Sequence, residues 1–216
     1  MKGKKKKHLA RTAKITLLVT VCALSGFAVY AACSELSPEP QKYEVKKYRE
    51  ISYPTPNIDR ERQNEVCGVI LHHTAEPTIE RSLAVLTSLE KKVGTHVCID
   101  TDGTRYIMAQ PNEVTYHAGF SVLDGREGCN GFTIGIEFQG NTLEKPLTQD
   151  QIQSAIQYLL PLIKQYNIPV KNIVTHEMVR QAYKAKYPNK RCYGKVDITQ
   201  TEYRRFMTAL RSELMR

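Results

Sequence analysis

Glycine and proline are scarce in this sequence, whose 216 residues include 12 Gly and 10 Pro. This low share excludes a collagen-like protein, and a content of 41% hydrophobic against 25% charged residues excludes an intrinsically disordered chain. The chain also lacks an internal repeat. Because domains usually run about 100 to 200 residues, we expect one globular domain with additional segments.

Beyond its first 14 residues the chain lacks an excess of charge. The formal net charge is +9, but seven of the 31 Lys and Arg residues precede Ile15, and no acidic residue occurs before Glu35. The remaining 24 basic residues are nearly balanced by 22 acidic ones. A nucleic-acid-binding domain needs basic residues spread over a face. The nearly neutral body of the chain therefore argues against nucleic-acid binding.

The N-terminus has the pattern of an export signal. Its basic cluster leads into residues 15–32, an uncharged apolar run that ends in small residues before Cys33. Ala31-Ala32-Cys33 resembles a bacterial lipobox, although Tyr30 stands where an aliphatic residue is usual. Lipidation of Cys33, an uncleaved anchor at the lower limit for spanning a bilayer, and secretion after cleavage at Ala31 remain open. We expect an exported protein of the cell envelope, most simply a membrane-anchored lipoprotein.

The region after residue 33 divides into two parts. Residues 34–62 are polar, contain four prolines and show no sustained periodicity. Proline-rich polar segments are extended spacers, so we predict a tether over 34–62. The folded domain is then expected at 63–216.

Strand and helix patterns are mixed within this domain. Apolar runs predict five strands. A turn at 101–104 predicts that the strands 95–100 and 105–110 form a hairpin. Leucines at helical spacing predict a helix within 78–93, and capping boxes at Thr148 and Thr199 predict two more. The predicted strands are 66–73, 95–100, 105–110, 132–138 and 173–176. We therefore predict an α/β or α+β fold with one central mixed sheet flanked by helices.

The domain contains four cysteines with no recognisable disulfide framework. An oxidising compartment permits a disulfide, yet a domain of this size needs no covalent staple, so free buried thiols are an equal alternative. The four are Cys67, Cys98, Cys129 and Cys192.

Two histidines end apolar runs and are the first candidates for a metal site. His72 and His176 could lie side by side at one edge of the sheet. A catalytic zinc site needs three protein ligands and one open position. Spacing alone is a weak signal, however, and the chain lacks the HExxH pattern of helical zinc proteases.

Six segments, read together and in order, carry a more specific signal. They resemble the amidase-2 superfamily, which includes AmpD-type N-acetylmuramoyl-L-alanine amidases, phage T7 lysozyme and the animal peptidoglycan recognition proteins. The resemblance covers residues 69–210, and HAG and IGIE are its most specific parts. It implies a mixed sheet with packed helices and a zinc ion at one end of the sheet. The segments are VILHHTA, GTHVCIDTDG, TYHAGFS, GREGCNGFTIGIEFQGN, VTHEMVR and GKVDI.

The resemblance implies a ligand set for Zn²⁺. His72 and His176 match the first two ligands, and His73 takes a structural or supporting role. The third ligand is an Asp or Cys two residues after a Lys. Asp197 and Cys192 both satisfy that spacing; we prefer Asp197, although the Pro-Gly that commonly follows the ligand is missing.

The resemblance also implies two catalytic residues. Glu137 would carry a proton from the attacking water to the leaving amine, and Lys195 would stabilise the oxyanion. Alternation along 132–138 places Glu137 on the face opposite Ile134, Ile136 and Phe138. Thr95 replaces a Tyr found in many members of the superfamily, which would leave more of the oxyanion stabilisation to zinc and Lys195.

Three further residues match groove-lining positions. His117, Arg126 and Asn130 are predicted to contact sugar or peptide, whereas His96 is expected to be structural. We thus predict a zinc-dependent hydrolase that cleaves the amide between N-acetylmuramic acid and L-alanine in peptidoglycan or muropeptides. The alternative is a peptidoglycan-binding module without catalysis. Under the leading interpretation, the expected partners of the protein are the peptidoglycan substrate and, through the N-terminus, the membrane. We expect a monomer.

Overall fold

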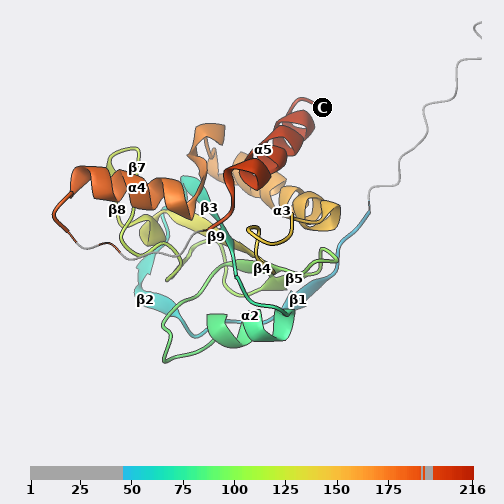
Figure 1. The fold of residues 1–216 in the computed structure, drawn as a ribbon, viewed down its shortest axis with the longest axis horizontal. Coiled ribbons are helices and arrows are strands. Elements are labelled where there is room, and N and C mark those ends of the chain that lie inside the picture. The colour runs from blue at the N-terminus through green and yellow to red at the C-terminus, as the bar shows by residue number, and fades with distance from the viewer. Residues whose placement is uncertain (1–45, 191, 193–196) are drawn as a thin grey trace, which may run out of the picture. The chain divides into compact units, whose positions relative to one another are not determined.

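A central sheet organises the domain in the computed structural model, which describes residues 46–190, 192 and 197–216 (Figure 1). The strands are β1 (Glu50–Ser52), β2 (Ile58–Gln63), β3 (Gly68–His73), β4 (Val97–Ile99), β5 (Arg105–Ile107), β6 (Glu113–Thr115), β7 (Val122–Leu123), β8 (Arg126–Glu127), β9 (Thr133–Phe138) and β10 (Ile173–Thr175). The helices are α2 (Ile79–Leu86), α3 (Gln149–Tyr166), α4 (His176–Lys186) and α5 (Gln200–Leu214), with 3₁₀ turns η1 (Cys129–Gly131) and η2 (Val170–Asn172). Among the described residues, no helix is long and apolar enough to cross a membrane. The predicted export segment lies outside the described residues.

The main sheet has six strands in the order β1-β5-β4-β9-β3-β10. Strands β4, β9, β3 and β10 run parallel, while β5 pairs antiparallel with β4. This confirms the predicted mixed sheet and the predicted hairpin. Parallel strands are usually covered on both faces, and β3 and β9 are buried along their whole length. Two small ribbons, β2-β6 and β7-β8, accompany the sheet.

Alternation along β9 separates the two faces of the sheet. Ile134, Ile136 and Phe138 join the main hydrophobic core, to which α3 and α5 contribute. Glu137 faces the other side, as predicted. On that side α2 packs near Cys98 of β4 and α4 packs near Ile70 of β3. The face of the sheet that carries Glu137 is therefore covered by α2 and α4.

Helix starts follow the predicted caps with one difference. Thr148 and Gln151 form a complete capping box at the start of α3. Thr199 caps α5, accepting from the Glu202 backbone N–H, but the Glu202 carboxylate accepts instead from the Leu147 backbone N–H at 2.9 Å. The second capping box is therefore formed only by its threonine, because a tertiary contact uses the glutamate.

The predicted boundary of the tether is wrong. Residues 50–52 form β1, an edge strand parallel to β5. Residues 58–63 form β2, which pairs antiparallel with β6 in a two-stranded ribbon. Between them Asn57 is buried, and its amide donates to the backbone oxygens of Ser88 and Val93 at 3.0 and 2.7 Å. These strands are short and largely exposed, so they leave no hydrophobic periodicity in the sequence. The compact unit begins at Lys47.

The predicted helix at 78–93 is also shorter than expected. Thr78 caps α2, which ends at Leu86, and Thr87 follows as its C-cap. The next residues form turns, with Leu89 exposed to solvent. The helical spacing of leucines therefore extends past Leu86, where the helix ends.

The four cysteines of the domain are free thiols, with Cys98 and Cys129 buried.

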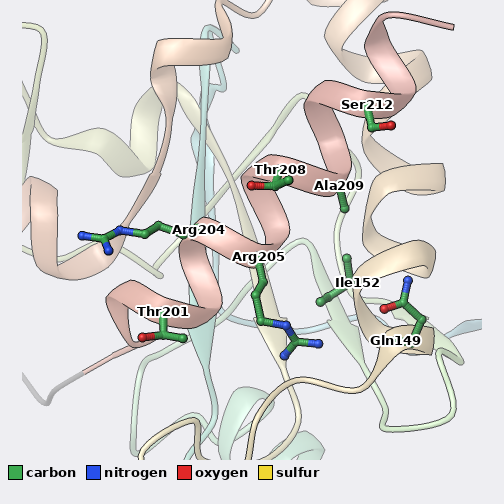
Figure 2. A pocket seen from close by; sticks show the side chains of 8 residues that line it. All are labelled: Gln149, Ile152, Thr201, Arg204, Arg205, Thr208, Ala209 and Ser212. Atoms are coloured by element: carbon green, nitrogen blue, oxygen red, sulfur yellow. The ribbon is translucent and has the colours of Figure 1, made fainter.

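A groove also lies between α3 and α5 (Figure 2). None of the predicted site residues that the structure describes lines it. Arg205, which lines it, is paired with Glu202, and the two helices pack on the sheet face opposite Glu137. This groove is therefore separate from the candidate site. Its lining residues are Gln149, Ile152, Thr201, Arg204, Arg205, Thr208, Ala209 and Ser212.

Candidate active site

Two parallel strands bring the candidate histidine ligands together. In the register of β3 and β10, Leu71 pairs with Thr175, so the next residues, His72 and His176, fall side by side. His176 is the first residue of α4, whose cap is the Thr175 hydroxyl. The predicted convergence of the two histidines at one end of the sheet is confirmed.

Asp197 completes a group of three that could hold a metal ion. One ligand atom from each of His72, His176 and Asp197 lies within 4.8 Å of the others. Asp197 Oδ2 is 3.2 Å from His72 Nδ1 and 3.0 Å from His176 Nδ1. Tetrahedral zinc with bonds of about 2.0 to 2.1 Å requires ligand atoms about 3.3 Å apart. The donor types and their spacing therefore fit zinc.

The backbone orients the carboxylate of Asp197. Its Oδ1 accepts from the backbone N–H groups of His73 and Ile198, at 2.7 and 3.1 Å, which leaves Oδ2 directed at the histidines. Burial tends to raise the pKa of Asp197, but the charges of His72 and His176 and hydrogen bonds from their rings hold that pKa well below its usual range. The carboxylate is thus kept as an anion.

His73 has the supporting role expected of it. Its side chain is buried, and its Nδ1 lies 3.1 Å from the Thr142 backbone N and 2.9 Å from the Thr142 hydroxyl. Its ring is thus tied to the loop after β9, whereas its backbone N–H binds Asp197.

Glu137 lies beside the three candidate metal ligands. It is opposite His72 in the pairing of β9 with β3, and its side chain is buried in the wall of a cavity of about 150 Å³. His72, His117 and His176 line the same cavity, and Val85 and Leu86 of α2 form an apolar part of its wall. A buried carboxylate beside three candidate ligands is suited to moving protons within a partly enclosed space.

The sequence did not identify every residue of this cavity. Thr74, Ser82 and Tyr116 also line it. Thr74 and Tyr116 are direct neighbours of His73 and His117, so their positions in the sequence were a usable signal. The contribution of α2 carried no such signal, because it depends on how the helix packs across the sheet.

Other predicted site residues have different surroundings. Cys192 is half-buried and is not a member of the ligand group, and Lys195 lies outside the described residues. Arg126 is exposed, ion-paired to Glu65 at 2.6 Å and stacked over Phe132. Its contact with substrate stays a prediction.

His117 and Asn130 both make polar contacts with other groups of the protein. His117 Nδ1 lies 3.2 Å from His72 Nε2, and Asn130 Oδ1 accepts from the backbone N–H groups of His117 and Ala118 at 3.1 and 2.7 Å. Burial, followed by the repulsion that protonated forms of His72, His96 and His176 would exert, holds the pKa of His117 well below its usual range. His117 is therefore a neutral ring packed among other histidines.

His96 is structural, in agreement with the prediction. Its Nδ1 accepts from the Gly135 backbone N–H at 2.9 Å, and its Nε2 lies 3.0 Å from the Glu113 carbonyl oxygen. Burial lowers the pKa of His96 to about 4. The ring therefore stays neutral and connects β9 to the β6 region.

A family model, amidase-2 or N-acetylmuramoyl-L-alanine amidase, matches residues 62–195. The chain belongs to this family. The match contains His72, Glu137 and His176 and ends two residues before Asp197, so the geometry above is what places Asp197 with the other two ligands.

Curated relatives of this amidase-2 chain carry amidase names. N-acetylmuramoyl-L-alanine amidase AmiD of Escherichia coli is 29% identical over 123 residues, which are 50% of this chain and 44% of AmiD. The 1,6-anhydro-N-acetylmuramyl-L-alanine amidase AmpD of Haemophilus influenzae is 37% identical over 90 residues, 40% of this chain and 47% of AmpD. The chain spans about half the length of the curated relatives it matches.

Solved structures support the amidase-2 fold. A crystal structure of AmpD has a TM-score of 0.52 at 22% identity and covers 76% of this chain and 96% of that one. A mutant endolysin from Bacillus subtilis has a TM-score of 0.53 at 20% identity, with 76% and 99% covered. At these identities the likeness establishes the fold alone.

Proposed function

We propose that this chain is a zinc-dependent N-acetylmuramoyl-L-alanine amidase that hydrolyses the amide between the lactyl group of N-acetylmuramic acid and L-alanine. The observation that carries the proposal is the convergence of His72, His176 and Asp197 beside the buried Glu137. Membership of the amidase-2 family and the amidase names of AmiD and AmpD support it.

The donor set suits zinc in a catalytic rather than a structural site. Two neutral imidazoles and one carboxylate supply three ligands and leave one position open. In such a site zinc lowers the pKa of water to about 7 and polarises the carbonyl under attack. His72, His176 and Asp197 would hold the ion, and Cys192 is set aside as a ligand.

Residues of the protein would transfer the proton of the attacking water and stabilise the negative charge on the carbonyl oxygen. Glu137, across from His72, would accept the proton of the attacking water and deliver it to the nitrogen of the leaving L-alanine. Lys195 is proposed, from the family resemblance, to stabilise the negative charge that develops on the carbonyl oxygen. The apolar wall formed by Val85 and Leu86 would limit the access of bulk water.

The proposed place of action is outside the cytoplasm. The basic N-terminus followed by an apolar run at 15–32 supports export, and Cys33 supports lipid attachment. A membrane-anchored enzyme would meet peptidoglycan or its released fragments. Recovery of the protein in the membrane fraction of cells, and its release by Cys33→Ala, tests the anchor; recovery of wild type in the soluble cytoplasm would contradict it.

The activity is tested with purified muropeptides and mass spectrometry. We expect free peptide beginning with L-alanine, lost after treatment with a chelator and restored by Zn²⁺. Glu137→Gln should lower kcat by on the order of 10²-fold or more while zinc still binds, and Glu90→Gln, at an exposed position, serves as the matched control. Intact muropeptide with a folded, zinc-loaded protein would instead indicate the peptidoglycan-binding module.

A further inference from the structure

We propose that His117 and Asn130 act on the metal ligands rather than on the substrate. The segment His117-Ala118 contacts the Nε2 atoms of His72 and His176, the ring nitrogens that do not face Asp197. Asn130 holds that segment in place. This inference rests on the proposed metal site, and it assigns the two residues a positioning role.

His72 shows the first contact. Its Nδ1 faces Asp197 Oδ2, so Nδ1 is its metal-side nitrogen and Nε2 carries the proton. Nε2 lies 3.2 Å from His117 Nδ1, which accepts that proton in a hydrogen bond. The His117 proton then lies on Nε2, 3.3 Å from the Thr133 hydroxyl oxygen. That hydroxyl donates onward to the Cys129 carbonyl at 2.7 Å, so its oxygen is free to accept.

His176 shows the second contact. Its Nδ1 also faces Asp197 Oδ2, and its Nε2 lies 3.2 Å from the Ala118 carbonyl oxygen. A carbonyl can only accept, so Nε2 of His176 carries a proton, and a metal that displaces the Nδ1 proton would then meet the Nδ1 lone pair. Consecutive residues of one loop thus select the tautomers of both ligands.

Asn130 anchors this loop to the sheet. Its Oδ1 accepts from both consecutive backbone N–H groups, and η1, which contains it, leads directly into β9. The loop is therefore tied to the strand that carries Glu137.

Gly135 makes the arrangement possible. A Cβ at this position would lie 2.7 Å from His117 Cγ, closer than real Cβ contacts allow, and 3.0 Å from Thr95 Oγ1, which is also a tight approach. The glycine of the IGIE segment therefore leaves room for the His117 ring to lie close to β9, with its Nδ1 3.2 Å from His72 Nε2. This close fit indicates a built contact rather than a chance approach of two rings.

Two amide substitutions separate the role of His117 from a general loss of packing. Asparagine places its Oδ1 near the position of the His117 Nδ1, whereas glutamine reaches the position of Nε2. In the full chain, His117→Asn should therefore keep the acceptor for His72, and His117→Gln should lose it while retaining a polar contact to Thr133. Competition with a chromogenic chelator measures the Kd for Zn²⁺.

We expect His117→Gln to weaken zinc binding by about 10- to 100-fold and His117→Asn to restore most of it. Asn130→Ala should weaken zinc binding similarly, and Asn130→Asp, which keeps the acceptor oxygen, should restore it. At saturating zinc, the KM for muropeptide should stay within about twofold of wild type. Circular dichroism of the chelator-treated proteins checks that each variant is folded.

Two results would overturn the inference in different ways. A wild-type chain that fails to bind zinc would remove the metal site, and with it both the proposed function and this role. A wild-type chain that binds zinc no better than His117→Gln and Asn130→Ala, with KM raised in these variants, would instead assign both residues to substrate binding and leave the proposed function standing.

Discussion

A single buried histidine makes stability depend on pH. His96 is fully buried, and burial lowers its pKa to about 4, whereas an unfolded chain protonates histidine near pH 6.5. The unfolded state therefore binds more protons between these values. The stabilisation is complete above about pH 6.5 and is lost as the pH falls toward 4, by on the order of 3 kcal/mol.

Replacing this histidine by asparagine tests that assignment. His96→Asn keeps an acceptor for the Gly135 backbone N–H but cannot titrate. In urea unfolding with chelator present, the free energy of unfolding of wild type should fall by about 2.4 kcal/mol more than that of His96→Asn between pH 7 and pH 4.5. The other histidines are present in both proteins, so the difference between the two curves reports His96 together with its electrostatic effect on His117. Parallel pH curves would mean that the His96 ring is protonated in the native state.

The adjacent histidines show what a residue's neighbours in sequence can and cannot tell. Alternation in a strand predicts that His72 and His73 face opposite sides, and the structure agrees. Alternation does not say which of them faces the site, and only the family resemblance made that choice. For His117 and Asn130 even the resemblance was insufficient, because their contacts run between a loop, a 3₁₀ turn and two strands.

At the scale of elements, the strongest local patterns were reliable. The apolar runs that end in His73 and before His176 became β3 and β10, and the turn at 101–104 joined β4 to β5. The position of β9 between β3 and β4 could not be read from the sequence. That order depends on contacts between segments tens of residues apart, which no local pattern records.

Polar elements were the ones that the sequence concealed. Strands β1 and β2 expose most of their residues, so hydrophobic periodicity is absent where backbone pairing is present. Around them, stabilisation comes from hydrogen bonds of buried polar side chains: Thr55 donates to the Leu86 carbonyl at 2.6 Å, and Asn57 binds the carbonyls beyond α2. Prolines at 54 and 56 suggested a spacer, although they only separate two strands.

At the scale of the whole molecule, these strands decide where the folded domain begins. A fragment that starts at residue 64 would leave the edge of β5 unpaired. It would also remove the Glu50 partner of Arg105 and leave the carbonyls of Leu86 and Val93 without the donors that Thr55 and Asn57 supply. Each lost buried hydrogen bond costs about 1 kcal/mol, so the combined loss is a large part of the stability of an ordinary domain.

We therefore expect residues 47–216 to unfold at the same temperature as the full chain, and residues 64–216 to unfold at least about 10 °C lower or to remain unfolded, since 1 kcal/mol shifts Tm by about 2 to 4 °C at this size. Thermal unfolding followed by circular dichroism measures both. Equal Tm values for the two fragments would restore the tether to residue 62. A lower Tm for 47–216 than for the full chain would show that residues before 47 also stabilise the fold. Since Asn57 binds the carbonyl of Val93, which lines the cavity, the shorter fragment should also lose the shape of the site.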